Sequence, residues 1–187
     1  MIHHVNGSDL EGPFPEQFEI AYFGMGCFWG AERLFWSLDG VFLTSVGFTG
    51  GTIKNPTYES VCSGSTNHVE AVQVVYDPNV ISYIKLLEIF WKSHNPTQEM
   101  RQGNDRGTQY RSAIFCTSED HYYLSLETRT QFQHAIINTG SKNLITTEIS
   151  YLEVYYFAEE YHQQYLSKNP NGYCGIKGNG IQCDFVI

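Results

Sequence analysis

The sequence has few positive charges and no long apolar run. Of its 187 residues, 11 are Lys or Arg and 20 are Asp or Glu, so the formal charge is −9. Nucleic-acid and anionic-membrane surfaces need a basic footprint, so neither kind of partner is expected. No segment approaches the ~18 apolar residues of a membrane span. The first 20 residues contain no Lys or Arg and no apolar signal core, so we expect an untargeted, cytoplasmic protein.

A disulfide framework is also absent from the pattern. The five cysteines are an odd number, in a chain without a secretory signal, and this favours free, reactive thiols. No internal repeat or low-complexity linker interrupts the chain, and 42% hydrophobic residues suffice for one core. We expect a single domain over residues 19–187. Residues 1–18 are expected to form an extended, loosely held N-terminal arm in which His3 and His4 are solvated.

Hydrophobic periodicity predicts an α+β fold. Apolar and β-branched runs predict strands at 19–23, 41–48, 69–76, 111–117 and 144–152. Four helices are expected: one ends near Gly40, one runs from a Thr117–Asp120 capping box to Gly140, and one covers 158–166. The fourth is capped by Ser82, and its apolar stripe consists of Tyr83, Leu86, Leu87, Phe90 and Trp91.

The first six of these elements have the order β-α-β-β-α-β. This order is typical of a two-layer, ferredoxin-like (split βαβ) core with helices on one face of a mixed sheet. The later helices and strand are additions to that core, and the glycine-rich residues 168–187 are expected to form a long irregular tail. A doubly wound nucleotide-binding fold is disfavoured. GMGCFWG lacks the third glycine in place, and Phe28 and Trp29 would block a pyrophosphate.

Cys27, in GMGCFWGAE, is the first candidate functional residue. It lies between the end of a predicted strand and the first turn of a predicted helix, flanked by Gly26 and Gly30. Unpaired main-chain N–H groups and the positive end of the helix dipole favour an anion there. We therefore expect the thiol to ionise below its usual pKa of ~8.5 and to act as a nucleophile. A buried, inert cysteine is the alternative.

Glu70 is the second candidate, because the predicted strand at 69–76 has apolar side chains on both faces. A carboxyl group there would be partly desolvated, which raises its pKa and makes it a proton donor near neutral pH. A glutamate at the strand end that reaches water is the alternative.

Tyr58 and Tyr110 stand in the polar, turn-rich segments NPTYESVCSG and GNDRGTQYRS, where a phenol would point into a cleft. Asp105 shares the second segment. It can equally be a turn residue that bonds its own main chain.

Cys174 and Cys183 stand nine positions apart in the glycine-rich stretch GYCGIKGNGIQC. They can swing and meet each other, as thiol–disulfide exchange requires. Zinc is the competing idea, but no CxxC motif or histidine pair accompanies them, so no metal site is expected. Cys62 has no comparable context, and Cys116 is expected to be a small hydrophobe in a strand.

The chain resembles the peptide methionine sulfoxide reductase A family in seven segments, in the family's order, from about residue 20 onward. They are GCFWGAE, GFTGG, NPTYESVCSG, EAVQVVYDP, QGNDRGTQYRS, EEYHQQYL and KNPNGYCG. The resemblance implies an enzyme that reduces the S epimer of methionine sulfoxide in oxidised proteins, with the free amino acid left open. It implies thioredoxin as the reductant, no metal or organic cofactor, and repair of oxidised proteins as the role. We expect a monomer.

The resemblance also implies roles for individual residues. Cys27 would attack the sulfoxide sulfur and become a sulfenic acid. Glu70, Tyr58 and Tyr110 would hold and protonate the sulfoxide oxygen. Phe28 and Trp29 would form an apolar wall for the substrate methyl group. Asp105 and His162 would line the site near the substrate backbone. Cys174 and Cys183 would recycle the oxidised cysteine.

Two departures from the family pattern are visible. Asn67 and Val69 replace the more usual glycine and alanine beside Glu70, and IQCDF lacks the proline often found after the last cysteine. Asn tolerates the left-handed backbone that a glycine would adopt, so Glu70 need not be disturbed. Substrate preference could still differ.

Three other classes of protein share part of this pattern. A cysteine peptidase would need a histidine base near Cys27, and His68, His94 and His162 lack an accompanying Asn or Asp motif. A thiol peroxidase would not need an apolar methyl pocket. A redox-sensing or binding module would have no reason to combine Glu70 with two tyrosines.

Overall fold

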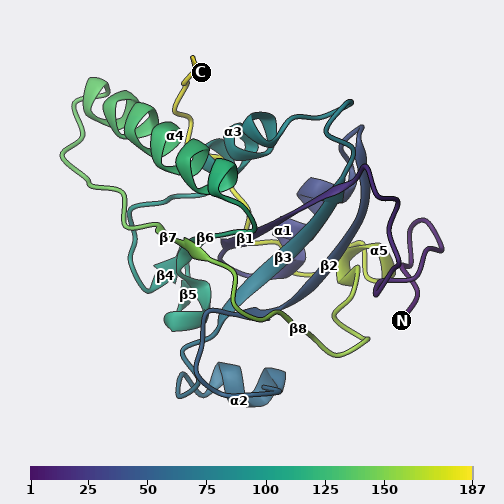
Figure 1. Cartoon of the computed structure of the whole chain (residues 1–187). Helices are drawn as coiled ribbons and strands as arrows, with labels where there is room; N and C mark the ends of the chain where they lie inside the picture. Colours follow the sequence, from purple (N-terminus) through teal and green to yellow (C-terminus); the bar gives the residue numbers. More distant parts are fainter. Residues whose placement is uncertain (187) are drawn as a thin grey trace.

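The structure is a computed structural model that describes residues 1–186 (Figure 1), and its centre is a six-stranded sheet. The sheet is formed by β1 (Glu19–Met25), β2 (Val41–Thr49), β3 (Val69–Tyr76), β6 (Ser112–Cys116), β7 (Glu148–Tyr151) and β8 (Tyr156–Phe157). Their spatial order is β7-β6-β1-β3-β2-β8, and only the β6–β7 pair is parallel. The sheet is therefore mixed, as the sequence predicts.

Five helices and a small hairpin accompany the sheet. The helices are α1 (Phe28–Trp36), α2 (Tyr58–Cys62), α3 (Tyr83–Ser93), α4 (Glu119–Asn138) and α5 (Tyr165–Lys168). The hairpin pairs β4 (Arg101–Gln102) with β5 (Asp105–Arg106), and a 3₁₀ turn at Thr108–Tyr110 follows it.

The main core lies between one face of the sheet and helices α1, α3 and α4. Phe28 and Phe35 of α1 pack there with the apolar stripe of α3 and with inward-facing side chains of the strands. The α3 stripe predicted from sequence is buried at every position, and Ser82 caps this helix by accepting a hydrogen bond from the Lys85 N–H. Aromatic side chains dominate this core, which fixes α1 firmly on the sheet.

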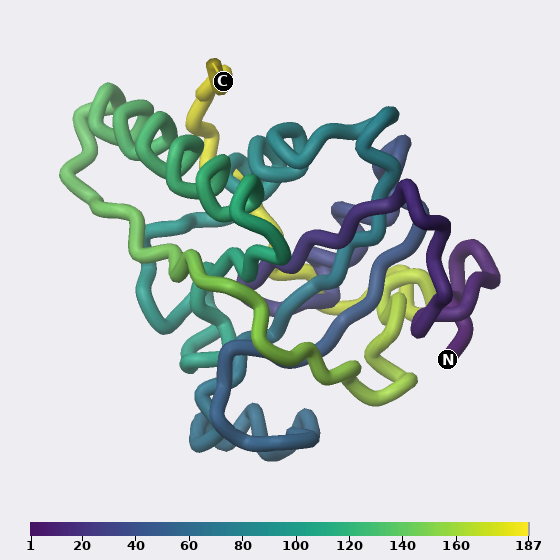
Figure 2. The backbone as a smooth tube through the Cα atoms, in the orientation of Figure 1, coloured from purple at the N-terminus to yellow at the C-terminus, as the bar shows by residue number. Residues whose placement is uncertain are grey.

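The N-terminal arm packs on the opposite face of the sheet, contrary to the prediction of a loosely held segment. Leu10 is buried against Leu43 and Val75. His3 is buried as well, and its Nε2 lies 3.3 Å from Thr44 Oγ1. The arm also runs beside the chain around α5 (Figure 2), where the His4 N–H donates to Gln164 Oε1 at 2.9 Å. β3 is buried on both faces because the arm covers part of the second one.

Several element boundaries differ from prediction by one or two residues, and four differences change the cap, the length or the type of an element. Helix α1 ends at Trp36, before Gly40. Helix α4 is capped by Ser118, whose side chain accepts from the His121 N–H, while the Thr117 hydroxyl bonds the main chain of β1. The strand predicted at 144–152 is regular only over Glu148–Tyr151. The helix predicted at 158–166 is a series of turns followed by the short α5, because Gln164 has a left-handed conformation with φ 48°.

Within residues 1–186, none of the helices combines the length and the apolar character needed to cross a membrane. The same residues contain no cluster of three or more His, Cys, Asp or Glu side chains arranged to hold a metal ion.

Candidate active site

Cys27 occupies the junction between β1 and α1, where it is the N-cap residue of the helix. The preceding Gly26 has φ +85°, and a side chain there would run into Gln102 of β4. Gly30, one turn into α1, leaves room for the tail, because an added Cβ would lie 2.9 Å from Cys174 Sγ. The two glycines therefore let other segments approach the cysteine closely, as expected.

Glu70 lies beside this helix start and is 1% exposed. Its Oε2 accepts a hydrogen bond from the Phe28 N–H at 3.1 Å, so the first main-chain donor of α1 binds the carboxyl group. Burial raises the pKa of Glu70 to about 8, with a smaller opposing effect of the Phe28 hydrogen bond. The alternative of a glutamate that reaches water is excluded, and burial favours the predicted neutral carboxylic acid near pH 7.

The prediction that the Cys27 thiol ionises easily is wrong for the free protein. Burial raises the pKa of Cys27 well above its usual value, and the nearby Glu70 carboxylate adds to the effect. The N–H of Trp29, which faces the sulfur, acts in the opposite direction but is the smaller influence. The helix start does favour an anion, as argued from sequence, but desolvation outweighs it here.

Tyr58 and Tyr110 approach the same carboxyl group from different elements. Tyr58 opens α2, whose N-cap Thr57 forms a capping box with Ser60, and Tyr110 ends the 3₁₀ turn. Burial raises the pKa of both phenols, and the Glu70 charge raises each further, so both hydroxyl groups stay protonated. Both predicted tyrosines thus lie where the Glu70 charge reaches them, and the Cys62 thiol lies beside the Tyr58 hydroxyl.

Aromatic rings form a wall next to Cys27. Phe28 lies within 5.8 Å of Phe48 by ring centroids, and Trp29 stacks on Tyr165 with centroids 4.0 Å apart. The Trp29 Nε1–H donates to His162 Nδ1 at 3.0 Å. The indole can only donate, so neutral His162 carries its proton on Nε2.

His162 therefore presents a buried N–H beside the wall. Burial lowers the pKa of His162 to about 4, so the ring is neutral at pH 7. Among residues 1–186, its Nε2 is one of the few buried side-chain atoms without a hydrogen-bond partner. A donor in this position is available to an acceptor that enters the site.

The tail at 168–186 crosses the site and is fastened there by Asp105. The Tyr173 hydroxyl donates to Asp105 Oδ2 at 2.9 Å. The neighbouring Cys174 has its sulfur against Gly30, in the first turn of the helix that begins at Cys27. Asp105 thus lies on β5 beside the site and contacts the tail.

Cys183 lies farther along, between α3 and α4. The Asn179 side chain donates to the carbonyl oxygens of Trp91 and His94 at the end of α3, and Val186 exchanges two hydrogen bonds with the Gln131 side chain of α4. In this structure, contacts thus hold the tail on both sides of Cys183.

Three side chains at the site were not anticipated from sequence: Glu159, Tyr165 and Tyr173. Glu159 Oε1 accepts from the Tyr58 N–H at 2.9 Å and so ties α2 to the aromatic wall. Tyr165 and Tyr173 stand in EEYHQQYL and KNPNGYCG, beside residues that were singled out. Nothing in the local sequence distinguishes Tyr165 and Tyr173 from the rest of the thirteen tyrosines, because the role of each depends on a partner far along the chain.

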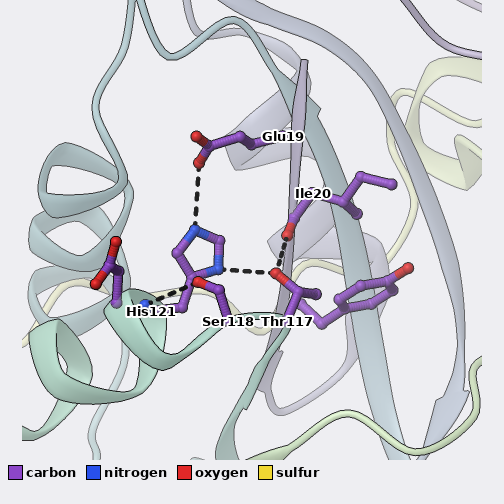
Figure 3. A pocket seen from close by; sticks show the side chains of 7 residues that line it. Glu19, Ile20, Thr117, Ser118 and His121 are labelled. Atoms are coloured by element: carbon purple, nitrogen blue, oxygen red, sulfur yellow. Dashed lines mark hydrogen bonds and ion pairs between the residues drawn. The ribbon is translucent and has the colours of Figure 1, made fainter. Parts of the chain in front are cut away.

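A separate surface hollow of about 460 Å³ lies at the opposite end of β1, lined by Glu19, Thr117 and His121 among others (Figure 3). His121 Nε2 lies 3.3 Å from Glu19 Oε2, and its Nδ1 lies 3.0 Å from the Thr117 hydroxyl. None of the candidate catalytic residues lines this hollow.

A cysteine at a helix start, a buried carboxyl group beside it and further thiols on a tail fit an oxidoreductase of the α+β class. The peptide methionine sulfoxide reductase family matches residues 19–185. A peptide methionine sulfoxide reductase MsrA of Agrobacterium fabrum is 56% identical over 97% of this chain and 84% of that protein. The chain belongs to the peptide methionine sulfoxide reductase family.

Solved structures agree with this assignment. Methionine sulfoxide reductase A of Corynebacterium diphtheriae superposes with a TM-score of 0.83 at 44% identity, over 97% of this chain and 87% of that one. Mxr1 from Saccharomyces cerevisiae in its reduced form gives a TM-score of 0.79 at 34% identity, over 87% of this chain and 91% of that one. Mxr1 has also been solved in complex with Trx2.

The burial of Glu70 predicts a pH-dependent difference in stability between the wild type and Glu70→Gln. The carboxyl pKa is 4.5 in its ordinary state and about 8 in the folded protein, so the folded state binds more protons between these values. The wild type therefore loses stability as pH rises through this window, whereas glutamine does not titrate. Between about pH 5 and pH 9, the free energy of unfolding of Glu70→Gln should therefore increase relative to that of the wild type by on the order of a few kcal/mol.

Urea unfolding of both proteins at about pH 5, 7 and 9 measures this difference. The comparison cancels the opposite contribution of the buried neutral histidines, which is common to both proteins. A difference that does not change with pH would mean that Glu70 is not neutral in the folded state.

Proposed function

We propose that this protein reduces methionine sulfoxide to methionine in oxidised proteins, with Cys27 as nucleophile and Glu70 as proton donor. The observation that carries the proposal is the pairing of these two groups at one helix start. Glu70 Oε2 is bound to the N–H of the residue that follows Cys27, and its pKa of about 8 keeps it protonated at neutral pH. A sulfoxide oxygen is a poor leaving group until it is protonated, so an acid and a thiol are needed together.

The reaction balances with these two groups alone. As Cys27 Sγ attacks the sulfoxide sulfur, Glu70 delivers its proton to the oxygen, and the thiol proton replaces it on the carboxyl group. The attack forms an S–S bond between Cys27 and the substrate; this bond and the substrate S–O bond then break as the hydroxyl group passes to Cys27 and forms its S–O bond. Methionine leaves, and Cys27 is oxidised to a sulfenic acid. Deprotonation coupled to attack is consistent with the high pKa of the free thiol, since no stable thiolate has to exist beforehand.

Tyr58 and Tyr110 are proposed to hold the sulfoxide oxygen, because both carry protonated hydroxyl groups beside Glu70. Phe28 and Trp29 are proposed to receive the substrate methyl group. A chiral sulfoxide that places its methyl group on the rings and its oxygen at Glu70 presents only one epimer for attack. We propose that this epimer is S.

Asp105 and His162 are proposed to contact the substrate backbone. The unpartnered Nε2–H of His162 supports this role, because it can donate to a carbonyl oxygen. Asp105 is bound to Tyr173 in the structure, so a substrate that uses this carboxylate must compete with the tail.

Cys174 and Cys183 are proposed to recycle the oxidised Cys27. Cys174 has its sulfur against the first turn of α1, which favours it as the first thiol to attack the sulfenic acid. Cys183 would then attack Cys174 and move the disulfide to the tail. We propose a thioredoxin as the reductant, and the Trx2 complex of the yeast relative supports this choice.

The proposed order predicts different blocks in two tail variants. Cys183→Ser should stall as a Cys27–Cys174 disulfide, and Cys174→Ser as a sulfenic acid or a slowly formed Cys27–Cys183 disulfide. Without reductant, each variant should release one methionine per chain. The wild type should release two, because transfer of the disulfide to the tail frees Cys27 for a second attack. Methionine counting and peptide mapping after the burst measure this result.

Two outcomes would contradict the relay. A fast Cys27–Cys183 disulfide in the wild type would reverse the order of the two thiols. Full thioredoxin-dependent cycling of both variants would mean that the tail is not a relay.

The function itself is tested by measuring turnover of peptide methionine sulfoxide, hydrogen peroxide and a peptide ester in parallel, with separated sulfoxide epimers. We expect reduction of the S epimer with thioredoxin and no comparable turnover of the peroxide or the ester. Preferred turnover of peroxide or ester would contradict the proposal.

We further propose that the core is of the split βαβ type, which the strand order β6-β1-β3-β2 supports. A monomeric state and a cytoplasmic location remain predictions from sequence. Light scattering and cell fractionation would test them.

A further inference from the structure

The carboxyl group of Glu32 is completely buried in α1, one turn beyond Trp29. It accepts three hydrogen bonds: from the Gln164 main-chain N–H at 2.8 Å, from the Gln164 side-chain amide at 2.7 Å and from the Thr44 hydroxyl at 3.1 Å. No Arg, Lys or His within residues 1–186 forms an ion pair with it. Burial raises the pKa of Glu32 to about 7, and the Gln164 bonds oppose this effect.

A buried carboxyl group at this position is not needed to hold α1 on the sheet. Phe28, Ala31 and Phe35 of the same helix are already fully buried in the apolar core. An apolar side chain would fill the space without desolvating a polar group. The three hydrogen bonds are therefore what Glu32 contributes.

Those bonds hold an unusual turn. Gln164 has the left-handed conformation, φ 48°, which a residue with a side chain adopts only when its surroundings enforce it. Glu32 binds both the main chain and the side chain of this residue. The His4 N–H and the Gln164 side-chain oxygen add a contact from the N-terminal arm.

The turn positions the two residues that touch Trp29. His162 precedes Gln164 by two positions and accepts the Trp29 indole N–H at 3.0 Å, and Tyr165 follows it directly and stacks on the same ring. On the other side, the Gln163 side chain bonds both the N–H and the carbonyl oxygen of Val46 in β2. The wall segment 162–165 is thus fastened to β2 by the Gln163 side chain and by the Gln164 side-chain amide, which also donates to the Thr44 carbonyl oxygen. Through Glu32 it is fastened to the helix that begins at Cys27.

We propose that Glu32 is a positioning residue for the substrate pocket: through Gln164 it holds His162 and Tyr165 against Trp29 at a fixed distance from Cys27. The proposal rests on the proposed function in one respect, since the pocket it shapes is the one for methionine sulfoxide. Loss of this anchor loosens the wall without touching Cys27, Glu70 or their proton transfer. It should therefore weaken substrate capture more than the chemical step.

Glu32→Gln is the test, because it keeps the size of the side chain but turns one acceptor oxygen into an NH₂ donor. That donor faces the donors of Gln164, so at least one bond is lost. We expect kcat/KM for peptide methionine sulfoxide to fall roughly 10- to 100-fold, with a raised KM and a saturating single-turnover rate within about threefold of wild type. A variant that was merely less well folded would lose rate in proportion to its active fraction, with KM unchanged.

Glu19→Gln is the matched control, since it makes the same change at a carboxyl group that binds Tyr76 and His121 at the other end of β1 (Figure 3). Its kinetics should equal those of wild type. If Glu32→Gln does not fold, Gln164→Ala keeps the main-chain bond to Glu32 but removes the side-chain bond, together with those to the Thr44 carbonyl oxygen and the His4 N–H, and should raise KM in the same way. Binding of the sulfoxide peptide to Cys27→Ser, with and without Glu32→Gln, gives the same comparison without turnover.

The outcomes separate the two hypotheses. A wild type that fails to reduce methionine sulfoxide would overturn the function. If the wild type is active, two results would overturn the positioning role. One is a wild-type value of kcat/KM in both Glu32→Gln and Gln164→Ala. The other is a Glu32→Gln variant that loses single-turnover rate while its KM stays constant.

Discussion

Replacing Cys27 with serine should reduce methionine release to the background rate. A serine hydroxyl does not ionise at neutral pH, and its pocket already disfavours charge, since burial raises the pKa of the thiol itself. The oxygen of the sulfoxide would then have no acceptor, because a hydroxyl cannot form the sulfenic acid. The measurement is methionine produced under single-turnover conditions, with thioredoxin and with a chemical thiol reductant.

Cys116→Ser is the control for this variant. Cys116 lies at the end of β6, with its Sγ 3.9 Å from Ser125 Oγ of α4, and β6 pairs this end with the start of β1, away from the helix start that Cys27 caps. It should keep most of the wild-type rate, whereas residual activity of Cys27→Ser near the wild-type level would remove Cys27 from the mechanism.

Replacing Glu70 with glutamine should lower the single-turnover rate by roughly 10²–10⁴-fold, the usual range for general acid catalysis. The amide keeps the Phe28 hydrogen bond but has no proton to give to the sulfoxide oxygen. The wild-type rate should be highest where the carboxyl group is protonated and should fall as pH rises above its pKa of about 8. The variant should lack that fall.

Glu19→Gln again provides the matched change at a carboxyl group outside the site, and it should leave both the rate and its pH profile unaltered. A Glu70→Gln variant with the wild-type rate and pH profile would mean that another group protonates the sulfoxide oxygen. Tyr58 and Tyr110 would then be the candidates.

Local sequence patterns predict the helices and strands that pack in the regular sheet and on its face. β3 is found at the predicted residues, and α3 has the predicted cap and buried stripe, because periodicity and capping act over a few residues. The segment 158–166 was predicted as one helix, but residues 158–164 form turns and the helix α5 begins only at Tyr165. Its conformation is imposed by Glu32, Val46 and Trp29, which are more than 100 residues away in the chain.

The chemistry of the site follows the same division. The burial of Glu70 could be predicted because it depends on the strand that carries it. The pKa of Cys27 could not, because the direction of its shift is set by competition between the helix start and desolvation, and the latter depends on the whole surrounding structure. The anchored tail was missed for a similar reason, since glycine content says nothing of the Asn179 and Gln131 contacts.

The most direct test of the central claim is one turnover of a variant that lacks both tail thiols, Cys174→Ser with Cys183→Ser, on peptide methionine sulfoxide without reductant. The account predicts one methionine per chain and one added oxygen atom on the peptide that contains Cys27, detected by mass spectrometry after trapping with a sulfenic acid reagent. Methionine release with Cys27 unmodified, or no release from a folded protein, would contradict it.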